Sequence, residues 1–154
     1  LQQIFRAMDL EVAIERKDRP HSIELNLSGH NLGILIGKHG QTLDALQYLV
    51  NLAANQGLTE ERVRIILDIE DYRERREETL YRLAARLAER CCRTNQRVVL
   101  EPMNRHERKI IHLALQENHR VLTYSAGDEP FRKVVIEPKH RVSRMDGSMR
   151  EEDY

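Results

Sequence analysis

Two glycines that bracket a basic pair form the first pattern in the chain that could do chemistry. The run Gly37-Lys38-His39-Gly40 follows the apolar residues 34–36 and precedes an expected helix. Because glycine has no Cβ, the backbone of another molecule can approach such a loop closely. The N–H groups at the start of the next helix favour anions, and Lys38 adds a positive charge. Gly37, Lys38, His39 and Gly40 are therefore candidate residues of a clamp for a sugar–phosphate backbone.

A tight turn between two helices is the plain alternative for these glycines, and the four residues alone favour it. Other phosphate-binding loops are excluded by spacing. Three residues separate Gly33 from Gly37 where a P-loop needs four, and His39 stands where a P-loop has Ser or Thr to hold magnesium. The dinucleotide-binding run G-x-G-x-x-G does not occur in the sequence.

The second pattern opens a helix that we expect over residues 104–116. Asn104 is a suitable N-cap, and Glu107 follows three residues later, as in a capping box. Cations crowd these first turns although each opposes the helix dipole at a cost of roughly a few tenths of a kcal/mol. They are Arg105, His106, Arg108 and Lys109. A helix that accepts this cost is a candidate anion site.

Arg108 and His112 are the sharpest candidates in this helix. They lie four residues apart, so both project from one face. Arginine offers a planar fork to a phosphate, and histidine can add a hydrogen bond or stack on a base. We expect these two residues to meet phosphate or base, with Arg105 as a helper. A solvated helix face with His112 partly packed is the alternative.

The remaining reactive residue types indicate neither catalysis nor metal binding. The seven histidines are scattered, without a convincing metal-ligand spacing. Cys91 and Cys92 are adjacent and cannot bridge distant segments, which is typical of an intracellular protein. Cys91 continues an apolar stripe, so we expect a buried structural thiol. No catalytic residue, metal or cofactor is predicted.

Composition restricts the class of protein further. The 154 residues include 25 basic and 25 acidic side chains, which excludes a globally basic coat but not a local basic patch. No apolar run reaches the roughly 18–20 residues that span a bilayer, and the N-terminus does not resemble a secretory signal. We therefore expect a cytoplasmic protein. The absence of an initiator methionine indicates a fragment of a longer chain.

Hydrophobic periodicity predicts alternating helices and strands. Helices are expected over residues 1–8, 31–36, 41–55, 70–95 and 104–116, and strands over 9–17, 22–27, 62–69, 97–100, 120–125 and 131–136. Turns are expected at 17–20 and 127–130. One apolar stripe of the helix over 41–55 should be buried, namely Leu43, Leu46, Leu49, Val50 and Ala53.

This order predicts an α+β protein with two small α/β-sandwich modules joined by a long helix. We divide it into a first module at 1–70, a linking helix at 71–96, a second module at 97–138 and a polar, frayed tail at 139–154.

The first pattern resembles a known family when its surroundings are included. Residues 34–47, Ile-Leu-Ile-Gly-Lys-His-Gly-Gln-Thr-Leu-Asp-Ala-Leu-Gln, look like the nucleic-acid-clamping loop of a KH domain. The β-β-α order before the loop and the α-β order after it match a type II KH domain. This resemblance covers about residues 1–70.

The second pattern resembles an R-three-H domain, named for its R-x-x-x-H motif. Residues 101–104, Arg108-x-x-x-His112 and the two closing strands carry this resemblance, which covers about residues 97–138. The pairing of the two modules is similar to the bacterial Jag (SpoIIIJ-associated, KhpB-type) RNA-binding proteins. His106 departs from the pattern, because an aromatic residue such as tyrosine is expected there. Members of that family usually carry a further N-terminal domain and an acidic linker.

The resemblance implies a non-enzymatic, cytoplasmic protein that binds single-stranded RNA. It further implies an RNA chaperone or post-transcriptional regulator linked to cell shape and envelope homeostasis. A small stand-alone KH protein, or self-association through the KH module, is the implied protein partner. Two alternatives stay open: a single-stranded DNA-binding protein, and a dimerisation or scaffold module that uses the KH fold for protein contacts.

Overall fold

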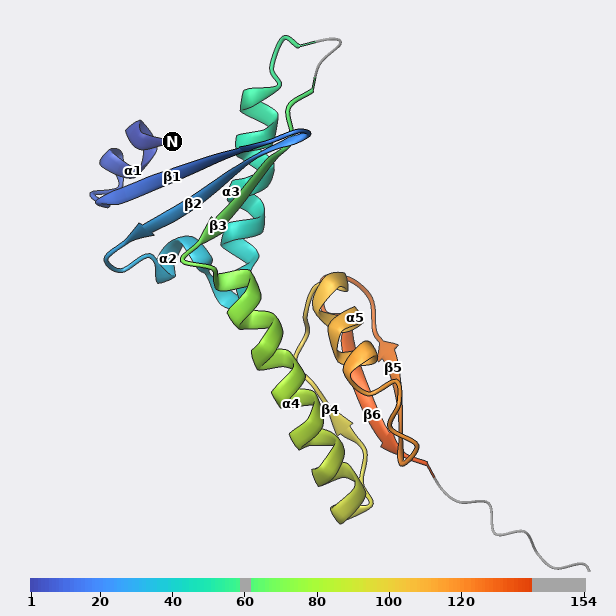
Figure 1. Cartoon of the computed structure of the whole chain (residues 1–154). Coiled ribbons are helices and arrows are strands. Elements are labelled where there is room, and N and C mark those ends of the chain that lie inside the picture. Colours follow the sequence, from blue (N-terminus) through green and yellow to red (C-terminus); the bar gives the residue numbers. More distant parts are fainter. Residues whose placement is uncertain (59–61, 140–154) are drawn as a thin grey trace, which may run out of the picture. The chain divides into compact units, whose positions relative to one another are not determined.

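The structure, a computed structural model, describes residues 1–58 and 62–139 (Figure 1). The chain forms two units, one comprising Leu1–Arg82 and one that begins at Leu83, and the division falls within the long helix α4 (Tyr72–Thr94). Each unit has a three-stranded sheet. The α+β class and the predicted order of helices and strands are therefore confirmed. The predicted tail lies outside the described residues from position 140 on.

The first unit packs three helices against its sheet. The strands β1 (Val12–Arg19) and β2 (Ser22–Gly29) are antiparallel, and β3 (Ile65–Ile69) runs parallel to β2. The helices are α1 (Gln2–Ala7), α2 (Gly33–Ile36) and α3 (Gln41–Ala54). The apolar face of the sheet and the inner faces of the helices form one core, built from Phe5, Leu27, Leu32, Leu35, Leu43, Leu67 and Ile69.

Three predicted boundaries in this unit are wrong for identifiable reasons. The turn expected at 17–20 lies at residues 20–21, because cross-strand pairing continues to Arg19 opposite Ser22. The strand expected from residue 62 begins pairing only at Ile65. The long helix starts at Tyr72 rather than at residue 70, because residues 70 and 71 have left-handed φ values of 48° and 55°.

The second unit is built on a sheet of order β4-β6-β5, made of β4 (Val98–Val99), β6 (Lys133–Pro138) and β5 (Val121–Ala126). Helix α5 (Arg105–Ala114) lies between β4 and β5 in the chain. The later turns of α4 bury Ala84, Ala88 and Cys91, which lie on one face of the helix. The thiol of Cys91 donates a hydrogen bond to the Ile136 carbonyl at 3.5 Å, so the expected structural thiol is confirmed.

Helix α3 departs from its predicted packing. Leu43 is fully buried, but Leu49 is 57% exposed and Ala53 is also exposed. The predicted burial is therefore wrong at Leu49 and Ala53, while Leu46 and Val50 are half-buried. The reason is that the face beside β3 carries amide side chains, which satisfy polar backbone rather than bury apolar surface.

These amides recur every four residues and follow the outer edge of β3. Gln47 Oε1 accepts the N–H of Leu67 at 2.9 Å. Asn51 both accepts from the N–H of Ile65 at 2.8 Å and donates to its carbonyl at 2.7 Å. Asn55 repeats this double contact with Val63. β3 is an edge strand, and an unpaired edge invites pairing with other chains. We call Gln47, Asn51 and Asn55 the amide ladder.

The central amide of the ladder should contribute measurably to stability. Asn51→Ala removes both partners of the Ile65 backbone, and we expect it to lower the free energy of unfolding by about 1–3 kcal/mol. Urea unfolding measures the loss, and faster hydrogen exchange at the Ile65 amide locates it. The control Gln56→Ala removes an exposed amide just beyond the same helix and should change stability by less than about 0.5 kcal/mol. Equal effects of the two substitutions would contradict this role.

Candidate nucleic-acid interface

The loop at 37–40 depends on backbone conformations that glycine adopts most easily. Gly37 has φ +70°, and Gly40 has φ +79°. A Cβ on Gly37 would collide with the Thr42 side chain, and one on Gly40 would lie 2.9 Å from Cε1 of Tyr72. The glycines are thus needed to form the turn itself. This is what the alternative interpretation of the pattern, a tight turn between two helices, requires. That requirement is compatible with a binding role, because the turn determines what the loop presents.

The loop presents one exposed cation and one half-buried imidazole. Lys38 is exposed, while His39 is half-buried with a left-handed φ of 55°. Of the apolar residues before the loop, Ile34 is 62% exposed but Leu35 belongs to the core. An apolar surface for bases at residues 34–36 would therefore consist mainly of Ile34.

Helix α4 contributes contacts to this loop, and to α3 and β3, that the sequence patterns did not indicate. Nη2 of Arg76 lies 2.6 Å from Nδ1 of His39. Arg73 donates to the Asp44 carboxylate at 2.8 Å, to the Leu67 carbonyl at 3.3 Å and to Gln47 at 3.4 Å. Contacts between residues 26 to 37 positions apart leave no local pattern in the sequence. Only the fold brings Arg73 to Gln47 and Arg76 to His39.

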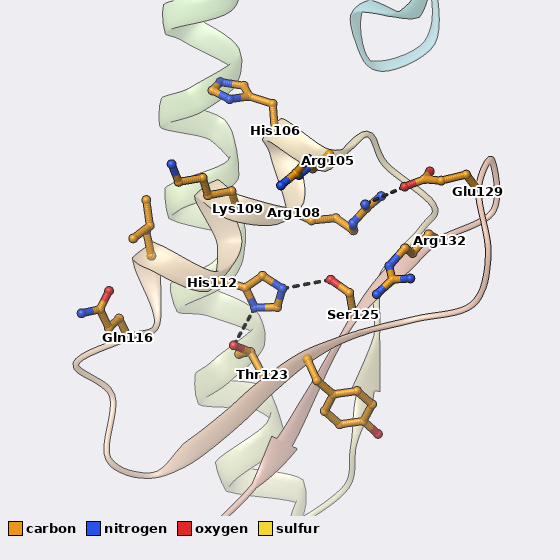
Figure 2. A pocket seen from close by; sticks show the side chains of 12 residues that line it. Arg105, His106, Arg108, Lys109, His112, Gln116, Thr123, Ser125, Glu129 and Arg132 are labelled. Carbon is orange, nitrogen blue, oxygen red and sulfur yellow. Dashed lines mark hydrogen bonds and ion pairs between the residues drawn. The ribbon is translucent and has the colours of Figure 1, made fainter.

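The second candidate site lies between α5 and the strand β5 (Figure 2). Asn104 caps α5 as predicted, accepting from the Glu107 N–H at 2.9 Å. Arg108 and His112 both point from α5 into this open cavity. The other cations that line it are Arg105, Lys109 and Arg132, of which the first two are exposed.

The two motif residues are held by partners inside this cavity. The side chain of Arg108 is only 7% exposed, and it donates to the Met103 carbonyl at 2.7 Å and to Glu129 at 2.6 Å. The ring nitrogens of His112 lie 2.8 Å from Thr123 Oγ1 and 3.0 Å from Ser125 Oγ. The predicted pair thus shares one face, and each member also ties α5 to another segment.

Two further lining residues were not predicted as site residues. The sequence indicates Lys109 only as one of the cations at the start of the helix. Arg132 follows the turn at 127–130, and no local motif indicates that it belongs to the site. Tyr124 lies on β5 between Thr123 and Ser125, so its ring points to the opposite face of the strand from the two hydroxyls that contact His112 and does not replace the aromatic residue expected at position 106. Its hydroxyl donates to Glu137 at 2.7 Å, and this bond is the main reason that the pKa of Tyr124 is raised.

Two family models match the chain at these two sites. The KH domain of KhpA and KhpB matches residues 1–67, and the R-three-H domain matches residues 78–138. A relative from Bacillus subtilis is 38% identical over 141 residues, which cover 90% of this chain and 67% of the relative. The chain belongs to the KhpB family.

Other KhpB relatives agree with this assignment. One from Clostridium symbiosum is 48% identical over 146 residues, and one from Lactiplantibacillus plantarum is 46% identical over 112 residues. All three relatives bear the name RNA-binding protein KhpB. The chain covers 65% of the Clostridium protein and 34% of the Lactiplantibacillus protein.

Neither a metal site nor a membrane span is present in the described part of this KhpB-family chain. Within residues 1–58 and 62–139, no three His, Cys, Asp or Glu side chains gather in a way that could hold a metal ion. The helices described there are all too short or too polar to cross a bilayer.

His112 has an electrostatic environment that disfavours its charged form. Partial burial lowers its pKa, and the positive charge of Arg108 lowers it further. The unfolded chain therefore binds more protons than the folded one between the folded-state pKa and the ordinary value of about 6.5. The contribution of His112 to stability is fully present above that ordinary value and is lost as pH falls through the folded-state pKa.

We therefore expect the free energy of unfolding to fall as the pH is lowered below about 6.5, and to fall less in His112→Gln. Urea unfolding across this range measures the difference. His119→Gln, which changes an exposed histidine of the same unit, is the control for the general loss of a titrating ring. The expectation fails if both variants flatten the profile equally, or if His112 itself titrates at or above its ordinary pKa by NMR.

Proposed function

We propose that this chain binds single-stranded RNA through both of its modules and catalyses no reaction. The observation that carries the proposal is the loop at 37–40, whose glycine conformations hold Lys38 out at the surface of a KH module. The name of the relatives, RNA-binding protein KhpB, supports RNA as the ligand. An RNA ligand also supports a cytoplasmic location. We keep the division into modules at 1–70 and 97–138, a joining helix at 71–96 and a tail at 139–154 as part of this proposal.

In the first module, Gly37, Lys38, His39 and Gly40 would contact the sugar–phosphate backbone. KH loops of this kind clamp about four nucleotides. The contact needs close approach of main chain to main chain, which the glycines permit, and a cation to offset the phosphate charge. Base contacts would fall on the partly exposed apolar side chains before the loop, of which Ile34 is the most accessible.

In the second module, the exposed cations and the motif pair would take different roles. Arg105 and Lys109 stand at the surface and can meet phosphates directly. Arg108 can do so only where a phosphate displaces Glu129, and that carboxylate is 59% exposed and able to move. Both ring nitrogens of His112 already have hydroxyl partners, so the ring face is what it can offer to a base.

Charge removal at the two sites tests the proposal. Lys38→Gln and Lys109→Gln should each weaken binding of a single-stranded RNA oligomer about two- to tenfold. Each should also reduce the slope of log affinity against log salt by about 0.7, the value for one phosphate contact on a single strand. Fluorescence anisotropy at several salt concentrations measures both quantities. Lys17→Gln, which removes the same charge from β1, is the matched control.

RNA binding through these sites is refuted if both lysine variants match Lys17→Gln in affinity and slope. A DNA oligomer of the same sequence, used as competitor, separates RNA binding from the single-stranded DNA alternative. Equal competition would favour a binder of either nucleic acid. The cellular role implied by the family resemblance, an RNA chaperone or post-transcriptional regulator of cell shape and envelope homeostasis, is proposed only together with RNA binding.

We also propose that the KH module associates with a second KH module, from another copy of this chain or from a small stand-alone KH protein. An apolar face on α3 supports this. Tyr48, Leu49 and Leu52 are 68%, 57% and 60% exposed, and Ile4 on α1 is 52% exposed. Exposed apolar side chains gathered in this way are typical of protein-interaction surfaces.

Leu52→Asp should reduce this association. Sedimentation velocity of the chain alone tests self-association, and addition of a stand-alone KH protein tests the second partner. Leu122→Asp places the same charge on a leucine that is 49% exposed on β5 and should leave both unchanged. A wild-type chain that is monomeric and ignores the added KH protein would exclude this partner class.

A further inference from the structure

A second cavity of the second unit is lined by cations and is separate from the one at the R-x-x-x-H motif. Its volume is about 470 Å³, and it lies where the end of α4 meets the start of β5 and the end of β6. The lining residues are Cys92, Asn95, His119, Arg120, Pro138 and Lys139. None of them lines the cavity that holds Arg108 and His112. We call this second cavity the end pocket.

Backbone pairing holds the two permanent cations of the end pocket opposite each other. Val121 faces Pro138 in the antiparallel register of β5 and β6. The Lys139 N–H donates to the Arg120 carbonyl at 2.9 Å, so the pairing continues by one position and Arg120 faces Lys139. Residues directly opposite each other on antiparallel strands have Cβ atoms about 4.5–5.5 Å apart. The fold therefore brings two positive side chains together.

Two like charges in this arrangement repel each other and destabilise a sheet. Among the described residues, no Asp or Glu lines the end pocket to offset the repulsion. Glu137 lies two residues before Lys139, but its carboxylate accepts a hydrogen bond from the Tyr124 hydroxyl at 2.7 Å. The cavity at the motif differs, because Glu129 lies in it at 2.6 Å from Arg108.

An anion between Arg120 and Lys139 would replace this repulsion by two attractions. The other lining groups suit a phosphate, because the Asn95 amide and the His119 ring can donate hydrogen bonds to its oxygens. Arg120 offers a planar fork of N–H donors, and Lys139 offers a compact charge. Both side chains are exposed, so a phosphate of a polymer can reach them without any opening of the fold.

The negative end of α4 is the alternative reason for cations at this position. Cys92 belongs to the last turn of α4 and Asn95 follows it, and the free carbonyl groups of a helix C-terminus attract positive side chains. That end carries about half a negative charge, whereas the end pocket holds two full positive charges and a histidine. The helix end therefore does not account for the opposed pair.

The charge of the whole second unit favours a polyanion as the ligand. From Leu83 to Lys139 the chain has 11 basic and seven acidic side chains, so the described part of this unit is positive overall. A positive surface attracts nucleic acid, whose backbone carries one phosphate per nucleotide, and each phosphate held by Lys or Arg adds to affinity.

We propose that the end pocket is a phosphate-binding subsite for the single-stranded RNA that the second module binds. Arg120 and Lys139 hold one backbone phosphate between them, and Asn95 and His119 donate to its oxygens. The inference rests on the proposed function and adds to it a contact surface outside the R-x-x-x-H motif.

The test compares single-stranded RNA binding by wild type and two double variants across a range of salt concentrations. Arg120→Gln with Lys139→Gln, the pocket variant, removes both permanent charges. Arg86→Gln with Arg90→Gln is the matched control, since both arginines are exposed on α4 in the same unit. The pocket variant should bind about two- to tenfold more weakly than the control, with a salt slope lower by about 0.7 for one phosphate contact. Arg120→Lys with Lys139→Arg keeps both charges and should retain the wild-type slope.

Folding stability separates a ligand site from a role at the end of α4. Because the two cations repel each other in the free protein, Arg120→Gln alone should be at least as stable as wild type in urea. A lower urea midpoint of Arg120→Gln together with an unchanged RNA affinity would overturn the proposal, because the arginine would then serve the helix. Equal affinities and slopes of the pocket variant and its control would overturn it as well.

Lys109→Gln is measured alongside, because Lys109 lines the other cavity of the same unit. If Lys109→Gln lowers affinity and slope while the pocket variant matches its control, only this inference is wrong. If Lys109→Gln matches Lys17→Gln and the pocket variant matches its control, the RNA binding proposed for the second module fails with it.

Inorganic phosphate is the second probe and needs no RNA. When phosphate replaces chloride at constant ionic strength, the NMR signals of the Arg120 and Lys139 amides should shift in wild type and in the control variant. The same amides of the pocket variant should not shift. Phosphate-induced shifts in wild type, combined with a pocket variant that binds RNA like its control, would overturn RNA as the ligand and indicate a small phosphorylated molecule instead.

Discussion

Arg73 ties three elements of the first unit together, and the geometry of the candidate clamp depends on it. Its guanidinium contacts Asp44 and Gln47 on α3 and the carbonyl of Leu67 on β3. The ion pair with Asp44 is about 40% exposed and contributes little by itself, of the order of 0–1 kcal/mol. The network matters more than the pair, because Gln47 Oε1 also receives the Leu67 N–H and so belongs to the amide ladder. The interaction therefore fixes where α4 begins relative to α3. The loop at 37–40 directly precedes α3 in the chain and contacts α4 through His39.

The two candidate sites use opposite means to present charge. In the first site, the backbone conformation positions the charge. Positive φ values at Gly37, His39 and Gly40 shape a turn that leaves Lys38 at the surface. In the second site, contacts between side chains position the charge, and the motif arginine, Arg108, is largely buried. Removing one partner of a buried, hydrogen-bonded charge costs far more than losing an exposed pair, so Arg108 is as much a structural tie as a ligand contact. A motif residue can thus hold the site together and still meet a ligand that displaces its acidic partner.

The polar residues of α3 explain why part of this helix leaves apolar side chains exposed. A helix beside an edge strand normally buries apolar surface, yet α3 directs amides at the free edge of β3. Apolar residues of α3 lie instead on its exposed face, at Leu49 and Leu52. One constraint, the need to satisfy an edge strand, therefore produces both the amide ladder and the exposed apolar face to which we assign a partner.

The amino-acid sequence by itself determined the α+β class, the order of the elements, the loop at 37–40 and the shared face of Arg108 and His112. These features are local, since they follow from hydrophobic period, helix capping and spacing within a few residues. It did not determine the start of α4, the packing of α3 or the contacts of Arg73 and Arg76. Only the tertiary structure decided those, because the contacts of α3, Arg73 and Arg76 join residues up to 37 positions apart, and such pairing leaves no periodic signal. An arginine selected for a distant imidazole looks, in sequence, like any other charge on a solvated helix.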